Sequence, residues 1–424
     1  MEFENQVLLG DCLEILKQIP DNTYHSIVTD VPYGLGDKDP TPEEILAFLG
    51  GAALKTGDFM KADWDIPSVA VWKEAYRVLR PGGYLLSFGG TRTWDLISMG
   101  IRMAGFELRD TLSEEYPALQ WIQGMGMNHG LNISKQIDKE LGLEREVIHR
   151  YKAGGNAMTS TKLKGGTYTT GAPNSPTGEL TITAPASEEA KQWDGWHTNL
   201  KPAWEPVMMF RKPLDGTVVE NIRKWGCGGI NIDGCRVYTD WQEPDRSDGW
   251  KRSGNTHKPD AKKIAAPPGN GIVCHPLGRV PANLVFVDAN GALGCPVAEL
   301  EDQKANTIRY FNVFPVPFMY CPKTSTKEAT LDGRIENQHN TKKPLAVMRW
   351  LVRMVTPKGG LTLDPYCGSG STLHAAIEEG CSFTGIERYR PSYETSLKRV
   401  ELVRADHAEA HAEKDLFDLA MSND

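Results

Sequence analysis

The feature of this sequence that constrains the fold most is an apolar run that ends in a glycine-rich turn. Leu361-Thr362-Leu363 is followed by Asp364-Pro365-Tyr366-Cys367-Gly368-Ser369-Gly370-Ser371, and an apolar helical pattern begins directly after it. Such a run predicts a buried strand, and the glycines after it allow the backbone to approach another group closely. In an open α/β sheet, ligands bind at this carboxyl edge of the strands.

A second strand end of this kind lies near the N-terminus. Ser26-Ile27-Val28-Thr29 is followed by Asp30-Val31-Pro32-Tyr33, which supplies a carboxylate, a backbone carbonyl and an aromatic ring on a stiff turn. Pro32 favours extended geometry at Val31, and β-branching stiffens that residue further. Both turns are therefore candidates for one functional edge.

Strand and helix patterns alternate on both sides of a long irregular middle region. This alternation predicts a largely parallel, doubly wound α/β sheet. The predicted strands are 7–11, 25–29, 84–88, 206–210, 361–363 and 382–386. The predicted helices are 13–19, 69–79, 94–104, 344–355, 371–379 and 391–404.

The irregular stretches give a provisional division of the chain. Residues 151–194 are rich in Gly, Thr and Ser and predict a flexible insertion, and residues 215–337 lack sustained periodicity. The division is 1–150, 195–214 and 338–405 for the core, 151–194 for the insertion, 215–337 for an inserted recognition region, and 406–424 for an acidic tail.

Composition describes a globular chain with an uneven charge distribution. The formal net charge is −8, yet residues 201–280 contain 13 Lys and Arg against nine Asp and Glu, locally +4. No run approaches 18 apolar residues, and the N-terminus has no signal pattern, so we expect a cytoplasmic protein with no membrane partner. The eight cysteines lack paired metal-ligand spacing, so we expect reduced thiols and no metal.

The two turns resemble the motifs of amino-methylating DNA methyltransferases, the N6-adenine and N4-cytosine enzymes. Asp30 to Tyr33 resembles the catalytic Asp-Pro-Pro-Tyr, with Val31 in place of proline, and Asp364 to Ser371 resembles the S-adenosylmethionine motif Asp-Pro-Phe-x-Gly-Ser-Gly-Thr. His339-Asn340-Thr341-Lys342-Lys343-Pro344 is similar to the family's His-Pro-Thr-x-Lys-Pro. The motif order resembles the beta group.

The resemblance implies a seven-stranded methyltransferase (Rossmann-like) sheet in which segments 7–33 and 338–390 lie side by side. It also implies that Asp30 and the carbonyl of Val31 accept hydrogens from a base amine, while Tyr33 stacks on the flipped-out base. The implied catalytic residues are Asp30, Val31, Pro32 and Tyr33. The implied cofactor-binding residues are Asp11, His339, Asn340, Thr341, Lys343, Asp364, Pro365, Tyr366, Gly368, Ser369, Gly370, Ser371 and Glu387.

The implied reaction is site-specific methylation of double-stranded DNA, as in restriction–modification systems. Asp30 at the first motif position favours adenine N6 over the alternative, cytosine N4. Val31 and Asn340 leave open a non-catalytic DNA-binding relative, and a homodimer is a further open alternative. The region 215–337 is expected to read DNA, or else to serve oligomerisation or stability. The candidate DNA contacts are Arg223, Lys224, Arg236, Arg246, Lys251, Arg252 and Arg279.

Overall fold

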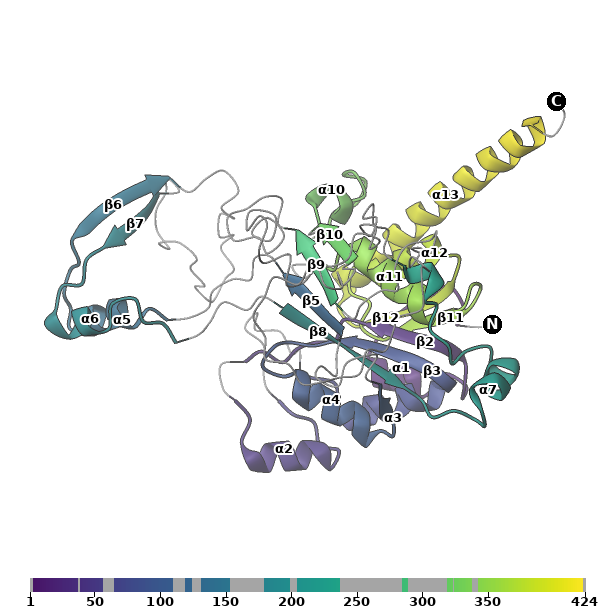
Figure 1. Ribbon diagram of the computed structural model, residues 1–424, viewed down its shortest axis with the longest axis horizontal. Coiled ribbons are helices and arrows are strands. Elements are labelled where there is room, and N and C mark those ends of the chain that lie inside the picture. Colours follow the sequence, from purple (N-terminus) through teal and green to yellow (C-terminus); the bar gives the residue numbers. More distant parts are fainter. Residues whose placement is uncertain are drawn as a thin grey trace, which may run out of the picture.

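A computed structural model gives the chain one large sheet with helices packed on both of its faces (Figure 1). Figure 1 also sets apart a small unit, β6, β7, α5 and α6, at the left of the view. The structure describes residues 3–36, 39–55, 65–109, 119–123, 131–152, 179–198, 204–236, 284–288, 319–322, 324–337 and 342–421.

The sheet contains ten strands within these described residues. Its order is β1-β12-β11-β2-β3-β8-β5-β9-β10, with β4 pairing with β8 beside this path. The strands from β1 to β3 run parallel, and β8 is antiparallel to both β3 and β5. The bounds are β1 Gln6–Leu9, β2 Tyr24–Thr29, β3 Leu79–Phe88, β4 Glu107–Leu108, β5 Leu119–Gln123, β8 Trp204–Arg211, β9 Leu284–Asp288, β10 Met319–Pro322, β11 Leu361–Asp364 and β12 Ser382–Glu387.

The expected doubly wound sheet is confirmed. The seven positions from β1 to β5 form the seven-stranded sheet, and β9 and β10 extend it beyond β5. β2 pairs with β11 through Ser26 with Thr362 and Ile27 with Leu363. This pairing brings the N-terminal and C-terminal parts of the chain side by side, as the resemblance implies.

Two apolar cores explain why the sheet is covered on both faces. Successive strand residues point to opposite faces, so Ile27 and Leu85 pack in one core while Val28 and Leu86 pack in the other. All four side chains are fully buried. The first core is closed by α1 Cys12–Leu16, α3 Val69–Val78 and α4 Trp94–Met103, and the second by α11 Leu345–Val355, α12 Ser371–Glu378 and the first part of α13 Arg390–Met421.

Some elements differ from the sequence-based expectation. Helix α2 (Pro42–Leu49) lies between the predicted strand 25–29 and the predicted helix 69–79, where no element was predicted, although its capping box of Thr41 and Glu44 is a helix start signal. Helix α13 continues to Met421, so much of the expected acidic tail is helical.

The described ends of the region 215–337 contact the core. Helix α7 (Val218–Trp225) packs on β3 through the buried Asn221, whose amide donates to the carbonyl oxygens of Pro81 at 2.9 Å and Cys227 at 2.8 Å. The 3-10 helix η1 (Asp233–Cys235) packs on α11, and Trp350 donates to the Cys235 carbonyl. At the other end of the region, α10 (Thr326–Ala329) is followed by Leu331 and Ile335, which are buried in the core. The contacts of Asn221 and Trp350 hold residues 215–236 against the core.

The described part of the expected insertion 151–194, with the residues just before it, forms secondary structure. β6 (Val147–Lys152) and β7 (Glu179–Thr183) form a two-stranded sheet beside α5 (Ile133–Glu140) and α6 (Glu188–Gln192). Asp138 joins these elements, because its carboxylate accepts bonds from Arg145 and from the backbone of Ala186 and Ser187. Residues 153–178 lie outside the described residues.

Candidate active site

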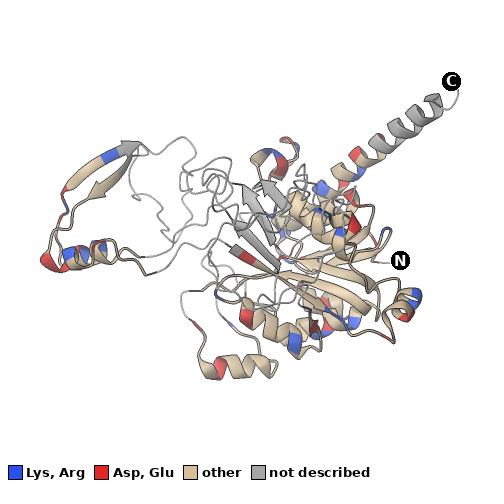
Figure 2. Cartoon of the chain, in the orientation of Figure 1, with Lys and Arg blue, Asp and Glu red and all other residues tan. Residues whose placement is uncertain are grey.

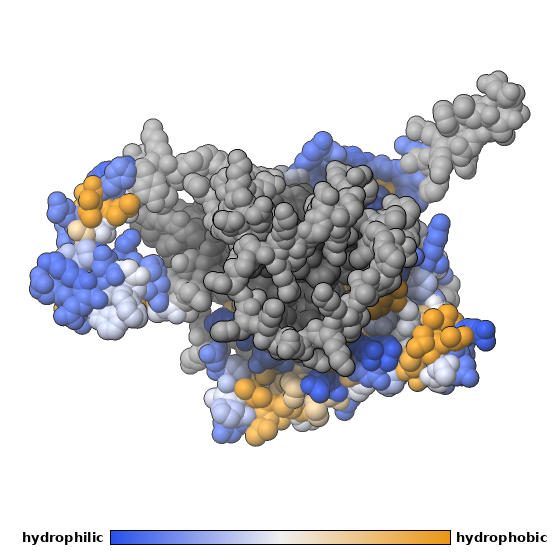
Figure 3. Space-filling model, in the orientation of Figure 1, coloured by the Kyte–Doolittle hydropathy of each residue, from blue (hydrophilic) through white to orange (hydrophobic). Residues whose placement is uncertain are grey.

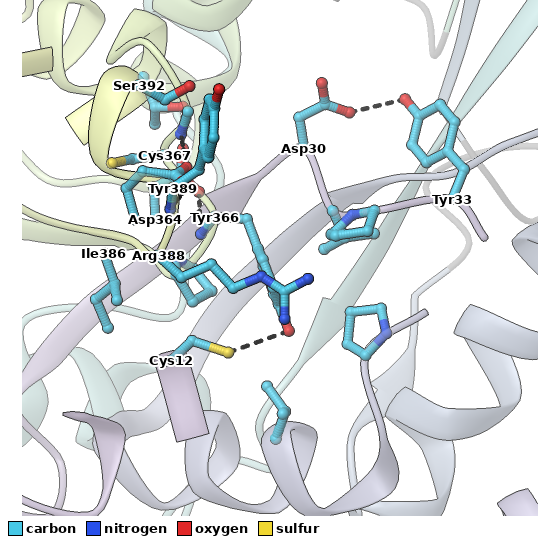
Figure 4. A pocket seen from close by; sticks show the side chains of 18 of the residues that line it. Cys12, Asp30, Tyr33, Asp364, Tyr366, Cys367, Ile386, Arg388, Tyr389 and Ser392 are labelled. Carbon is cyan, nitrogen blue, oxygen red and sulfur yellow. Dashed lines mark hydrogen bonds between the residues drawn. The ribbon is translucent and has the colours of Figure 1, made fainter. Parts of the chain in front are cut away.

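A cavity of about 340 Å³ lies at the carboxyl edge of the sheet. It is bordered by the loops that follow β1, β2, β11 and β12, as the placement of the two sequence turns predicts. Figure 4 shows Asp30 and Tyr33 across the cavity from Asp364, Tyr366 and Cys367. The two chemical motifs therefore share one site.

Asp30 is held at the end of β2 by two hydrogen-bond donors. Tyr33 donates its hydroxyl to Oδ1 at 2.7 Å, drawn as a dashed line in Figure 4, and Lys343 donates Nζ to Oδ2 at 2.6 Å. Val31 is 3% exposed and packs in the core with α1 and α3, so its apolar side chain anchors the turn. The substitution of valine for proline therefore retains a fixed turn through packing.

Lys343 is enclosed in the wall of the cavity beside Asp30. Its Nζ also lies 3.4 Å from Oε2 of Glu205 and 3.1 Å from the Tyr33 hydroxyl. Burial disfavours the charge of Lys343, but the two carboxylates outweigh burial and raise its pKa above the usual value. Burial and the nearby Asp30 likewise raise the pKa of Tyr33, so its hydroxyl stays protonated and donates.

The glycine-rich turn is fixed by Asp364. Its carboxylate accepts bonds from Thr29 at 2.7 Å, from Thr372 at 2.5 Å and from the backbone N–H of Tyr366 at 3.1 Å. Asp364 is 2% exposed, and burial raises its pKa to about 7 despite these donors. Its contacts join β2, the turn and α12, so its role is to hold the loop in shape.

Two glycines in this turn adopt the left-handed conformation. Gly368 has φ +51° and Gly370 has φ +85°, a region that glycine enters without steric cost. A Cβ on Gly370 would lie 3.1 Å from Cβ of Ser396 on α13. The sequence therefore requires glycine here for both the turn and the helix packing.

Glu387 ends β12 with its carboxylate beside the turn. Oε2 accepts from the N–H of Gly368 at 2.9 Å and Oε1 from the N–H of Tyr389 at 2.6 Å, and burial raises its pKa. A carboxylate offers about four acceptor directions, so Glu387 retains capacity for a further donor. After the neighbouring strand β1, the loop residue Asp11 caps α1 by accepting from Leu13 N–H at 2.9 Å.

These features fit a nucleoside cofactor. A carboxylate at a strand end can accept from both hydroxyls of a ribose, and the adjoining turn exposes backbone rather than bulky side chains. Asp30 presents a second carboxylate to the same cavity. The arrangement suits transfer of a group from a bound nucleoside to an amine held by Asp30.

The structure brings most of the sequence-based site residues to this cavity. The lining includes Asp11, Asp30, Val31, Pro32, Tyr33, Lys343, Asp364, Pro365, Tyr366, Gly368, Ser369, Ser371 and Glu387. Gly370 is not in the lining and instead precedes α12. His339, Asn340 and Thr341 lie outside the described residues. Lys343, which the resemblance assigns to the cofactor, lines the cavity and also contacts Asp30.

Two of the candidate DNA contacts lie at the opposite edge of the sheet. Arg223 and Lys224 are in α7, which packs near Pro81 at the start of β3, whereas the cavity lies beyond the strand ends. Lys224 is paired with Asp215, and Figure 2 shows both signs of charge on α7. Figure 3 shows an apolar patch at the same place, and the exposed apolar residues of α7 are Val218, Val219 and Ile222. This surface does not suit phosphate contacts.

The remaining candidate contacts have other outcomes. Arg236 follows η1 and pairs with Asp233 at 2.7 Å, with 15% of its side chain exposed. Arg246, Lys251, Arg252 and Arg279 lie outside the described residues.

Among residues with described side chains, no group of three or more His, Cys, Asp or Glu is arranged for a metal ion. The part of the chain that is described also contains no helix able to cross a membrane.

Several lining residues were missed by the sequence reasoning. Glu205, at the start of β8, lies beside Lys343, and Asp65 and Ser68 lie before α3. Arg388, Tyr389 and Ser392 follow Glu387 and reach the cavity, as Figure 4 shows. Their position directly after Glu387 could have indicated their place in the cavity. The place of Glu205 could not be predicted without the antiparallel direction of β8, which brings the start of that strand to the cavity.

Comparison with known proteins identifies the family of this chain. A family model described as DNA methylase matches residues 24–398. The type II methyltransferase M.HindIII of Haemophilus influenzae is 21% identical over 415 residues, which cover 92% of this chain and 93% of that relative. M.BglI of Bacillus subtilis is 38% identical over 68 residues, which are 16% of this chain and 20% of that protein.

Solved methyltransferase structures are also similar to this chain. The cytosine-N4-specific PvuII DNA methyltransferase is 12% identical, with 96% of this chain and 92% of that chain covered and a TM-score of 0.43. The M1.HpyAVI–SAM complex is 14% identical, with 93% and 98% covered and a TM-score of 0.36. Because the family model spans most of the sequence, the chain belongs to the N6/N4 DNA methylase family.

Proposed function

We propose that this DNA methyltransferase methylates the exocyclic N6 amine of adenine within a specific sequence of double-stranded DNA. The observation that carries the proposal is the Asp30 carboxylate, presented at the cavity by β2 and adjoining the glycine-rich turn. Aspartate at this motif position is the form that the resemblance associates with adenine enzymes. The target base leaves the duplex, because its amine is inaccessible inside the helix.

The chemistry follows from the weakness of the acceptor amine. Its lone pair is delocalised into the base ring, so acceptors that bind both amine hydrogens favour a more nucleophilic nitrogen. Asp30 and the Val31 carbonyl supply these acceptors. As the new N–C bond forms, the nitrogen loses one proton, and the Asp30 carboxylate takes it up. Tyr33 supplies the ring on which the base stacks.

S-adenosyl-L-methionine, the cofactor of this family, supplies a methyl group whose bond to sulfur breaks with the electron pair left on sulfur. We assign Glu387 to its ribose hydroxyls and the Gly368-Ser369-Gly370 backbone to its methionine part. Asp11 borders the adenine end of the cavity. Asp364 holds the turn through its hydrogen bonds with Thr29 and Thr372.

We propose that sequence recognition resides between η1 and α10, within the expected region 215–337. The support is the basic stretch 251–263, which contains five Lys and Arg against one Asp, because phosphate contacts require positive charge. Arg246, Lys251, Arg252 and Arg279 are the remaining candidates. Exchange of 237–323 with the segment of a relative should change the methylated sequence, and an unchanged sequence would place recognition elsewhere.

Nucleoside analysis tests the reaction. Unmethylated DNA is incubated with the protein and S-adenosyl-L-methionine, digested to nucleosides and examined by mass spectrometry. We expect N6-methyldeoxyadenosine. Detection of N4-methyldeoxycytidine instead would mean that the same site methylates cytosine. If neither product forms on a broad DNA panel but Val31→Pro restores activity, the non-catalytic alternative is favoured.

A further inference from the structure

One cation joins two carboxylates in the wall of the cavity. Lys343 lies 2.6 Å from Asp30 and 3.4 Å from Glu205, and these residues come from three distant segments of the chain. The side chain of Lys343 is 6% exposed, against 21% for Asp30 and 20% for Glu205. The aromatic ring of Phe88 closes the site at 4.9 Å from Nζ.

Stability alone gives little reason for this arrangement. Removing charged groups from water is costly, and apolar replacements of buried ion pairs are often neutral or stabilising. This cluster instead lies at the cavity and touches the residue assigned to catalysis. Ionisable groups gathered in a cleft are candidates for function.

We propose that Glu205 is a positioning residue for methyl transfer: it holds the Lys343 ammonium in place, and Lys343 in turn fixes the orientation and charge of the Asp30 carboxylate. The inference rests on the proposed role of Asp30. Without Glu205, Lys343 loses one of its two anionic partners and is free to shift along the cavity wall. A small displacement of a group that orients the acceptor amine is enough to slow transfer.

The test removes the charge of Glu205 while its shape is kept. Glu205→Gln is compared with Glu107→Gln, a matched control, because Glu107 pairs with Arg211 at the other end of β8, far from the cavity. Single-turnover methyl transfer, affinity for S-adenosylhomocysteine by calorimetry and thermal midpoint are measured for both. We expect Glu205→Gln to slow transfer by about tenfold or more, with cofactor affinity and midpoint close to those of Glu107→Gln.

A second readout follows the contact without catalysis. Lys343 is acylated by a small amine-reactive acylating reagent at pH 9, and the product is measured by peptide mass spectrometry. Because only the neutral amine reacts, the rate reports how much of the Lys343 amine is neutral. Glu205 is one cause of the raised pKa of Lys343. Glu205→Gln should therefore increase the rate of Lys343 acylation by about threefold or more relative to wild type and to Glu107→Gln.

The double variant Glu205→Gln/Lys343→Met separates positioning from a direct role. If Glu205 acts through Lys343, the double variant transfers methyl no more slowly than Lys343→Met alone. Multiplied losses would overturn the proposal, as would a wild-type transfer rate in Glu205→Gln. If the wild-type protein methylates no DNA, the proposed function fails, whereas unchanged acylation of Lys343 in Glu205→Gln refutes the contact itself.

Discussion

The two loops that border the cavity are held in different ways. The cofactor loop, residues 364–371, is fixed by buried bonds to neighbouring elements, with Asp364 bound to Thr29, Thr372 and its own turn. The catalytic loop, residues 30–33, depends on the ion pair between Asp30 and the distant Lys343. The first loop is fixed by hydrogen bonds that reach β2 and α12. In the second, the packed side chain of Val31 anchors the turn and a charged pair orients Asp30.

This difference implies that the two functions can be separated. Changes at the catalytic loop should alter methyl transfer and spare cofactor binding, because Glu387 and Gly368 do not depend on Asp30 for their contacts. Changes at the cofactor loop should alter binding first. Four variants test this separation, in decreasing order of expected effect.

Asp30→Ala should break catalysis alone. We expect methyl transfer to fall by about 10³-fold or more, because the acceptor for the amine hydrogens is lost. Calorimetry with S-adenosylhomocysteine should give an affinity close to that of wild type. Equal losses of transfer and binding would contradict the separation, and Asp30→Asn serves as the variant of matched size.

Glu387→Ala should break cofactor binding. Two charge-assisted hydrogen bonds to the ribose contribute about 3 kcal/mol together, so we expect S-adenosylhomocysteine to bind about 100-fold more weakly. Glu387→Gln, which retains one acceptor oxygen, should lie between Glu387→Ala and wild type. Binding of wild-type strength in both variants would exclude Glu387 from the site.

Asp364→Asn should change how the stability of the folded protein depends on pH. The pKa of Asp364 is raised to about 7 in the folded state, so the folded protein binds the extra proton and its stability falls as pH rises from about 4 to 7. Between pH 5.5 and 7.5 this contribution is about 2 kcal/mol. Urea unfolding should show a weaker fall in the variant than in wild type.

The same pH series contains an internal control. The pKa values of His25 and His374 are lowered to about 4, mainly by burial, so their contributions are lost as pH falls instead. They are unchanged in Asp364→Asn. Parallel stability curves for the variant and wild type would show that Asp364 does not titrate in this range.

Gly370→Ala should have the smallest effect. A left-handed φ of +85° and a Cβ 3.1 Å from Ser396 predict a loss of about 1–2 kcal/mol in the free energy of unfolding. Gly333→Ala is the matched control, because Gly333 has φ +84° with no atom within 4 Å of the added Cβ. An equal loss in both would assign the whole effect to backbone strain.

The sequence predicted the cofactor loop better than the catalytic loop, for a physical reason. The strand, glycines and helix around 361–379 are local patterns, and the observed elements follow them within a few residues. The contact of Lys343 with Asp30 depends on the pairing of β2 with β11 and on the position of α11. No local signal encodes such a contact, so the sequence alone did not predict it.

The recognition region shows the same limit. Basic residues in 215–337 suggested one DNA-reading segment, yet Asn221 and Cys235 tie its first part to the core. Arg223 and Lys224 are close in sequence to the other candidates but lie at the opposite edge of the sheet from the cavity. Charge counted along a chain does not give its position in space.

A crystal structure with S-adenosylhomocysteine bound tests the central claim most directly, namely that one cavity serves both loops. We predict that both ribose hydroxyls contact Glu387, that the methionine part lies along Gly368-Ser369-Gly370, and that the sulfur faces Asp30. A ligand bound away from Glu387, or with its sulfur turned away from Asp30, would contradict the account.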